Sequence, residues 1–196
     1  MFKKIALGLI LGLLFVSVSN ISGVQAATTI PSLQERKANN ISNAPHWLKK
    51  SINVYIPQNS RAASVRRAFL SWQNVSAGNL HFNFVNKGPA DIDVVFVDSV
   101  NGADGPLGEC ALKIQGKTIT KAEIKFATKS ANINKYSNDY IYTTMIHEVG
   151  HALGLKDIPG KPTSIMHTPI SETQEIKKMD VKNLFNLYGW SLLDRR

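Results

Sequence analysis

The stretch that decides the fold of this chain is HEVGHALGLKD, residues 147–157. His147 and His151 are four residues apart, so on a helix their side chains project from one face, one turn apart, and can bind a single zinc ion. Glu148 lies between them, where its carboxylate can act as general base toward a zinc-bound water. Gly154 tolerates a left-handed backbone conformation, which would end the helix sharply and bring Asp157 back to the metal as a third ligand.

The HExxH motif alone occurs in several zinc hydrolase folds, so the third ligand must be weighed separately. The main rival to Asp157 is Glu172, 21 residues beyond His151, because thermolysin-like sites take a distant glutamate from a second helix. Two interpretations without a metal site remain. Asp157 would then be a surface residue that follows a helix, and the two histidines would be ordinary core residues.

The amino terminus has the pattern of a secretory signal peptide. Two lysines precede a largely apolar run over residues 5–18, and small residues lead up to Ala26. The run is shorter than the ~20 apolar residues of a membrane-spanning helix, which favours cleavage after Ala26 over an uncleaved anchor. We therefore expect three segments: a signal peptide (1–26), a short polar lead-in or short propeptide (27–45) and one folded domain (46–196).

Composition narrows the class of protein. The 196 residues are 43% hydrophobic and 19% charged, enough for one domain with a core. Loss of residues 1–26 would remove two lysines and no acids, lowering the formal net charge from +9 to +7. The basic residues are scattered, which argues against nucleic-acid binding; such a chain can still associate with an anionic cell wall or membrane surface. Cys110 is the only cysteine, so no internal disulfide can form, a composition typical of bacterial exported proteins.

Hydrophobic periodicity predicts alternating strands and helices. Helices are expected around 65–72, from Asp139 through the zinc motif, and around 181–188 before Gly189. Strands are expected at residues 52–56, 80–84, 92–96, 109–114 and 122–126. This order predicts an α+β domain with a mixed twisted β-sheet.

The motif extended through Gly154 and Asp157, and followed nine residues later by Met166, resembles the signature of the metzincin zinc peptidases. The resemblance is closest to the matrixin branch and covers roughly residues 46–190. Segments 47–56, 63–75 and 187–189 resemble its first strand, its first helix and the end of its last helix. The resemblance implies a zincin-like single domain with an active-site helix and a C-terminal helix. Met166 would lie beneath the metal as a hydrophobic base, and His167 would be a loop residue near the site.

The chain departs from the matrixin pattern at several positions. Most matrixins have a third histidine where this chain has Asp157; a small bacterial secreted family, the snapalysin-like peptidases, uses aspartate there. The second, structural zinc site of matrixins is expected to be missing, because Cys110 and Lys125 fall near two of its histidine positions. A propeptide with an inhibitory cysteine is likewise not expected, because Cys110 is the only cysteine in the sequence.

The resemblance implies a secreted zinc-dependent endopeptidase of the EC 3.4.24 type, monomeric, with protein or peptide substrates. Its metal ligands would be His147, His151 and Asp157, and its catalytic residue Glu148. The edge strand around 108–112 would pair with the substrate backbone. The loop around Pro169 and Ile170 would shape the pocket for the residue after the cleaved bond.

Two alternatives stay open at this point. The chain could be a catalytically inactive metzincin-fold module that binds partners at the cell surface; the intact Glu148 argues against this. Calcium is a second candidate ion beside the one catalytic zinc, although the spacing of its oxygen ligands fits no calcium pattern well. Those ligands would be Asp91, Asp93, Asp98, Asn101 and Asp104.

Overall fold

The computed structural model describes residues 43–129, 133–172 and 175–191. The predicted signal peptide and most of the predicted lead-in lie outside these ranges. The elements, in chain order, are β1 Ser51–Tyr55, α2 Ala62–Val75, β2 His81–Val85, β3 Ile92–Val97, β4 Gly108–Gln115, β5 Thr118–Ala127, the 3₁₀ turn Ile133–Lys135, α3 Asn138–Ala152, β6 Ile158–Pro159, β7 His167–Thr168 and α4 Lys178–Tyr188.

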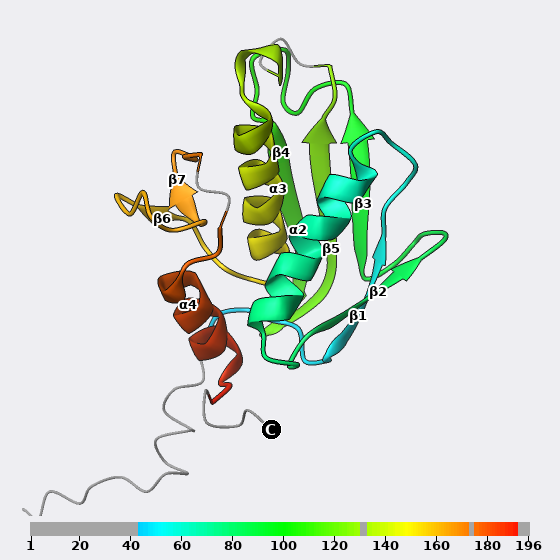
Figure 1. Ribbon diagram of the computed structural model, residues 1–196. Helices are drawn as coiled ribbons and strands as arrows, with labels where there is room; N and C mark the ends of the chain where they lie inside the picture. The colour runs from blue at the N-terminus through cyan, green and yellow to red at the C-terminus, as the bar shows by residue number, and fades with distance from the viewer. Residues whose placement is uncertain (1–42, 130–132, 173–174, 192–196) are drawn as a thin grey trace, which may run out of the picture. The chain divides into compact units, whose positions relative to one another are not determined.

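Five strands form one mixed sheet in the order β2-β1-β3-β5-β4. The first four strands of this order are mutually parallel, and β4 runs antiparallel to β5. Since β4 is last in the order, its outer edge pairs with no other described strand. Figure 1 shows α2 and α3 covering the same face of this sheet. The α+β prediction is confirmed.

Buried tryptophans fix α3 in place. Trp72 of α2 is fully buried and donates its indole N–H to the carbonyl of Ile146, at 2.8 Å. Trp47, ahead of β1, donates to the carbonyl of Ala152 at the same distance. A buried indole N–H needs such a partner, so each bond sets where its tryptophan docks on α3. The helix that carries the zinc motif is therefore held from two sides.

The exit from α3 is the sharp turn that the sequence predicts. Gly154 has φ +94°, and its N–H bonds to the carbonyl of His151 while that of Leu155 bonds to Gly150, which together make a Schellman motif. A Cβ at Gly154 would lie 2.3 Å from the carbonyl oxygen of Pro45, so space as well as conformation demands glycine here.

The predicted helices and strands are all present, with ends that shift by a few residues. β4 and β5 are longer than expected because they continue pairing close to the Gly116 turn. The stretch 158–168, where the sequence predicts no helix or strand, contains β6 and β7, which pair in parallel. Among the described residues, no helix has the length and apolarity needed to cross a membrane.

Candidate metal centre

Three side chains meet at the carboxyl end of α3. The Nε2 atoms of His147 and His151 are 3.0 Å apart, and Oδ1 of Asp157 lies 3.2 Å and 3.4 Å from them. Within the described ranges, no other group of three His, Cys, Asp or Glu side chains converges this closely. Two imidazoles and a carboxylate are a donor set that suits zinc and leaves a fourth position for water.

Both imidazoles are oriented by main-chain carbonyls. His147 donates from Nδ1 to the carbonyl of Ile165 and His151 from Nδ1 to that of Leu155, each at 2.9 Å. A carbonyl can only accept, so Nδ1 carries the proton and the Nε2 lone pair of each ring faces the shared point. Burial, with His151 nearby, lowers the pKa of His147, which keeps that ring neutral and able to bind a metal.

Asp157 is held differently from the histidines. Its side chain is 48% exposed, and its Oδ1 accepts a hydrogen bond of 2.9 Å from the hydroxyl of Thr168. Thr168 belongs to β7, which pairs with β6 directly after Asp157, so this small sheet brings the two residues together. Thr168 could not be predicted from the sequence, because a separation of eleven residues across a loop carries no periodic signal.

Glu148 lies between the two histidines and points toward the edge strand. It is 5% exposed, and a Cβ at Gly108 of β4 would lie 2.6 Å from its Cγ. Burial, reinforced by the charges of Asp157 and Glu109, raises the pKa of the Glu148 carboxyl to about 8. In the absence of a cation, this site therefore favours the protonated acid. A bound cation would favour the carboxylate instead.

A pocket of about 90 Å³ adjoins Glu148. One wall is the start of β4, a second is the Tyr140, Thr144, Glu148 face of α3, and Ile170 closes a third side. The rings of Tyr136 and Tyr140 stack at its rim, with centroids 4.2 Å apart. Ile170 thus lines a pocket beside the candidate base. That its loop shapes the pocket for the residue after the cleaved bond stays a prediction.

The segment around Met166 is anchored from α4. Asp180 is fully buried and accepts hydrogen bonds from the hydroxyl of Ser164, from the N–H of Ile165 at 3.1 Å and from the N–H of Lys177 at 2.8 Å. Ile165 in turn supplies the carbonyl that orients His147. In the sequence, nothing distinguishes Asp180 from any other polar residue in the first turn of a helix.

Met166 packs under α3. It is 1% exposed, and a Cβ at Gly150 would lie 2.4 Å from its sulfur. A glycine in mid-helix normally weakens the helix, and here it makes room for the methionine between α3 and its loop.

The remaining candidates lie elsewhere. Glu172 accepts a hydrogen bond from Ser137 at the opposite end of α3, 2.5 Å away, and is not part of the metal cluster. His167 contacts the carbonyl of Ile158, at 3.3 Å, and lies outside the cluster too. Four of the proposed calcium carboxylates each face a different lysine, which gives calcium no shared site among the described residues; the pairs are Asp91–Lys49, Asp93–Lys121, Asp98–Lys129 and Asp104–Lys135.

Cys110 and Lys125, the two residues near the structural zinc positions of matrixins, lie on adjacent strands. Cys110 is half-buried on β4, where burial raises the pKa of its thiol. Lys125 lies on β5 within 3.8 Å of Glu109 and 3.7 Å of Glu123. A neutral thiol and a lysine paired with carboxylates are poor zinc ligands.

Several known proteins are similar to part of this chain. It is 34% identical to interstitial collagenase of Oryctolagus cuniculus over 122 residues, which are 57% of this chain and 26% of that relative. It is 26% identical to macrophage metalloelastase of the same species over 155 residues, 74% of this chain and 33% of that relative. It is 28% identical to neutrophil collagenase of Homo sapiens over 162 residues, which are 75% of this chain and 34% of that relative.

The matched region thus spans about a third or less of the length of these relatives. The matrixin family matches over residues 44–189, which include every described helix and strand and all four candidate site residues. On this match and this fold, the chain belongs to the matrixin family of zinc peptidases.

Proposed function

We propose that this chain is a secreted zinc-dependent endopeptidase. The observation that carries the proposal is the convergence of His147, His151 and Asp157 on one point, with Glu148 buried between the two histidines. Membership of a zinc peptidase family supports it. An aspartate as third ligand, as in snapalysin-like peptidases, is chemically sound because carboxylate oxygen binds zinc well.

The chain's own residues define the chemistry. His147, His151 and Asp157 would hold zinc, which when bound supplies a Lewis acid for the attacking water and the scissile carbonyl. Glu148 accepts the proton of that water and then delivers it to the leaving amine. The buried position of Glu148 favours this role, since a carboxyl that readily exists in both protonation states can take and return a proton.

The substrate would bind as an added strand. The outer edge of β4, which pairs with no described strand, offers main-chain groups for pairing, as in other edge-strand recognition. The pocket of about 90 Å³ next to Glu148 would take one side chain, and its volume suits a small or medium aliphatic group better than an indole. Because Gly108 has no side chain, the substrate backbone can approach Glu148 closely.

We further propose that residues 1–26 direct export, that the mature chain acts as a monomer, and that its positive charge retains part of it on anionic cell-wall polymers. The amino-terminal sequence pattern and the net charge support this.

The decisive experiment compares three preparations of the mature chain on a denatured protein: untreated, treated with a chelator, and Glu148→Ala. We expect the chelator to abolish cleavage and added zinc to restore it. Loss of a general base costs ~10²–10⁴-fold in rate, so Glu148→Ala should lose at least about a hundredfold in kcat/KM while keeping its zinc. Equal cleavage in all three preparations would refute a zinc peptidase that acts through Glu148, and no cleavage in any of them would favour the inactive binding module.

A further inference from the structure

Three arginines at the start of α2 have no acidic partner in the part of the chain that the structure describes. Arg61 lies at the N-cap of the helix, and Arg66 and Arg67 follow within its next two turns. No ion pair among the described residues includes any of them, although Asp139 lines a pocket with two of them. A cation at a helix N-terminus opposes the helix dipole, so Arg61 stands where an anion would be favoured.

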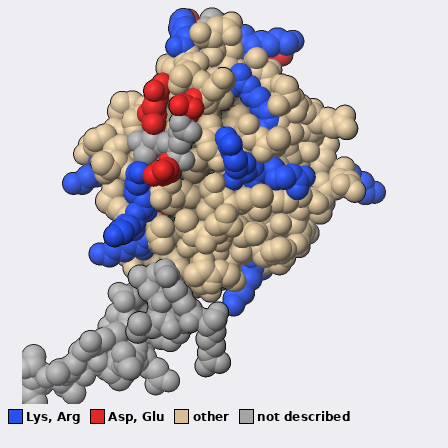
Figure 2. Space-filling model, in the orientation of Figure 1, with Lys and Arg blue, Asp and Glu red and all other residues tan. Residues whose placement is uncertain are grey.

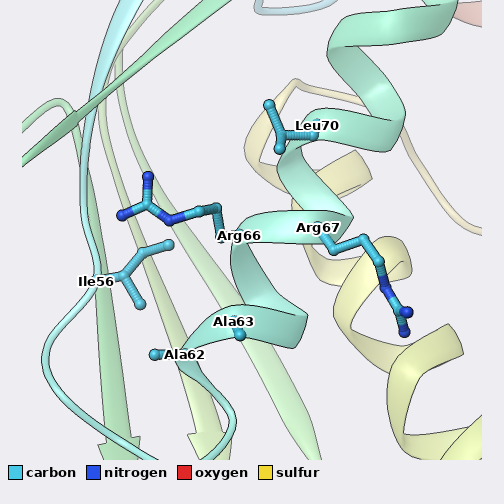
Figure 3. A pocket seen from close by; sticks show the side chains of 6 residues that line it. All are labelled: Ile56, Ala62, Ala63, Arg66, Arg67 and Leu70. Atoms are coloured by element: carbon cyan, nitrogen blue, oxygen red, sulfur yellow. The ribbon is translucent and has the colours of Figure 1, made fainter.

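Aromatic rings hold two of these guanidinium groups in place. The guanidinium carbon of Arg66 lies 4.0 Å from the ring centre of Phe84 on β2, and that of Arg67 lies 4.0 Å from the ring centre of Tyr142 on α3. Figure 3 shows the two side chains projecting to opposite sides of α2. Stacking occupies one face of each guanidinium and leaves N–H edges for an acceptor such as a carboxylate.

Two pockets meet at Arg67. The first, of about 350 Å³, is lined otherwise by Arg66 and by the apolar side chains of Ile56, Ala62, Ala63 and Leu70 (Figure 3). The second, of about 160 Å³, lies between α2 and the first half of α3 and is also lined by Arg61. We call the three arginines and these two pockets the arginine surface.

The arginine surface is separate from the candidate active site. Tyr142 and Met145 of α3 line its second pocket, whereas Thr144 and Glu148 line the pocket beside the edge strand. The second pocket of the arginine surface and the pocket beside Glu148 therefore lie on different faces of α3. In Figure 2, basic side chains lie over the part of the molecule where Figure 1 draws the amino-terminal half of α2.

We propose that the arginine surface binds a peptide segment in which carboxylates alternate with aliphatic side chains. The unpaired guanidinium groups match carboxylates in charge and geometry, and the largely apolar pocket of about 350 Å³ matches aliphatic groups. A polyphosphate or another polyanion without apolar groups would leave that pocket unfilled, so the apolar lining favours a peptide. In a peptidase, the arginine surface would hold a protein substrate at a distance from the cleaved bond. Binding of the peptide segment does not require that the chain cleaves it.

The test measures binding of short fluorescein-labelled peptides by anisotropy to the mature Glu148→Ala chain, which separates binding from any cleavage. One peptide alternates Leu and Glu, and a second of equal charge alternates Ser and Glu. The variants are Arg66→Gln/Arg67→Gln and the charge-preserving Arg66→Lys/Arg67→Lys. The matched control, Lys178→Gln/Lys182→Gln, removes the same charge from two exposed lysines on α4. Circular dichroism verifies that each variant is folded.

We expect the Leu/Glu peptide to bind more tightly than the Ser/Glu peptide. The affinity for the Leu/Glu peptide should fall about tenfold in the glutamine variant and by less in the lysine variant. In the control it should fall by less than about twofold. Equal losses in the glutamine variant and the control would overturn the proposal, since they would show attraction to net charge alone. Equal affinity for both peptides, or displacement by polyphosphate at the same charge concentration, would overturn it in favour of a general polyanion site.

Discussion

The two halves of the candidate metal centre are built in different ways. The helix half consists of residues on α3, of which His147 and Glu148 are 3% and 5% exposed. The loop half is Asp157, which follows the helix in the chain and has a side chain that is 48% exposed. The helix half is fixed by the spacing of residues along α3 and by packing around them. The loop half is fixed by hydrogen bonds that Thr168 and Asp180 make across the chain. The loop half should therefore be the one that tunes metal affinity.

The largest effect should come from removing a ligand of the helix half. Structural zinc sites provide ~10–16 kcal/mol from four ligands, so His147→Ala should weaken zinc binding by roughly 3–4 kcal/mol, which is about 150–700-fold. Asp157→Ala should lose less, because water can replace an exposed carboxylate. Competition with a chromophoric chelator measures both affinities. A larger loss in Asp157→Ala than in His147→Ala would reverse the comparison, and unchanged affinity in Asp157→Ala would remove it from the ligand set.

The second effect concerns the anchor of the loop half. Asp180→Asn keeps one carbonyl acceptor but loses the carboxylate that receives three donors, at a cost of about 2 kcal/mol in the free energy of unfolding. Urea unfolding of the metal-free protein measures it. Glu175→Gln, which removes a charge from an exposed residue nearby, is the control and should show no measurable change. Equal stability of both variants would show that Asp180 does not anchor the Met166 segment.

The third effect isolates the bond between Thr168 and Asp157. Thr168→Val keeps the shape of the side chain and removes the hydroxyl, so zinc affinity should fall by roughly 10–100-fold, as for other residues that orient a ligand. Thr168→Ser should restore most of it. Stability of the metal-free protein serves as the second readout: if Val and Ser variants bind zinc equally and differ only in stability, the hydroxyl has no role at the metal.

The smallest effect tests the contact between Glu148 and the edge strand. Gly108→Ala would place a Cβ 2.6 Å from Cγ of Glu148 and 3.0 Å from a methyl group of Thr144. Because the glutamate side chain can shift, we expect a cost near the low end of overpacking, about 1 kcal/mol, seen as a severalfold fall in kcat with zinc content unchanged. A fall in zinc content instead would place the damage in the helix half as a whole.

Most of the fold could be predicted from the sequence because its signals are local. Alternation over two residues identified the five strands of the sheet, and the 3.6-residue period identified the helices, including the one that ends at Gly189. The short strands β6 and β7 could not be predicted, because a two-residue strand shows no hydrophobic period. The position of Glu172 also has no local signal in the sequence, so this residue stayed a rival ligand. The fold places it at the far end of α3.

The sequence by itself determined the helix half of the site: the spacing of His147, Glu148 and His151 on one helix, and the turn at Gly154 that returns the chain. Tertiary structure decided which groups complete and orient that site, namely the hydroxyl of Thr168, the carboxylate of Asp180 and the close approach of Gly108. The physical reason is that helix geometry fixes the distance between residues four apart. The distance between residues eleven to forty apart depends on how the whole chain packs.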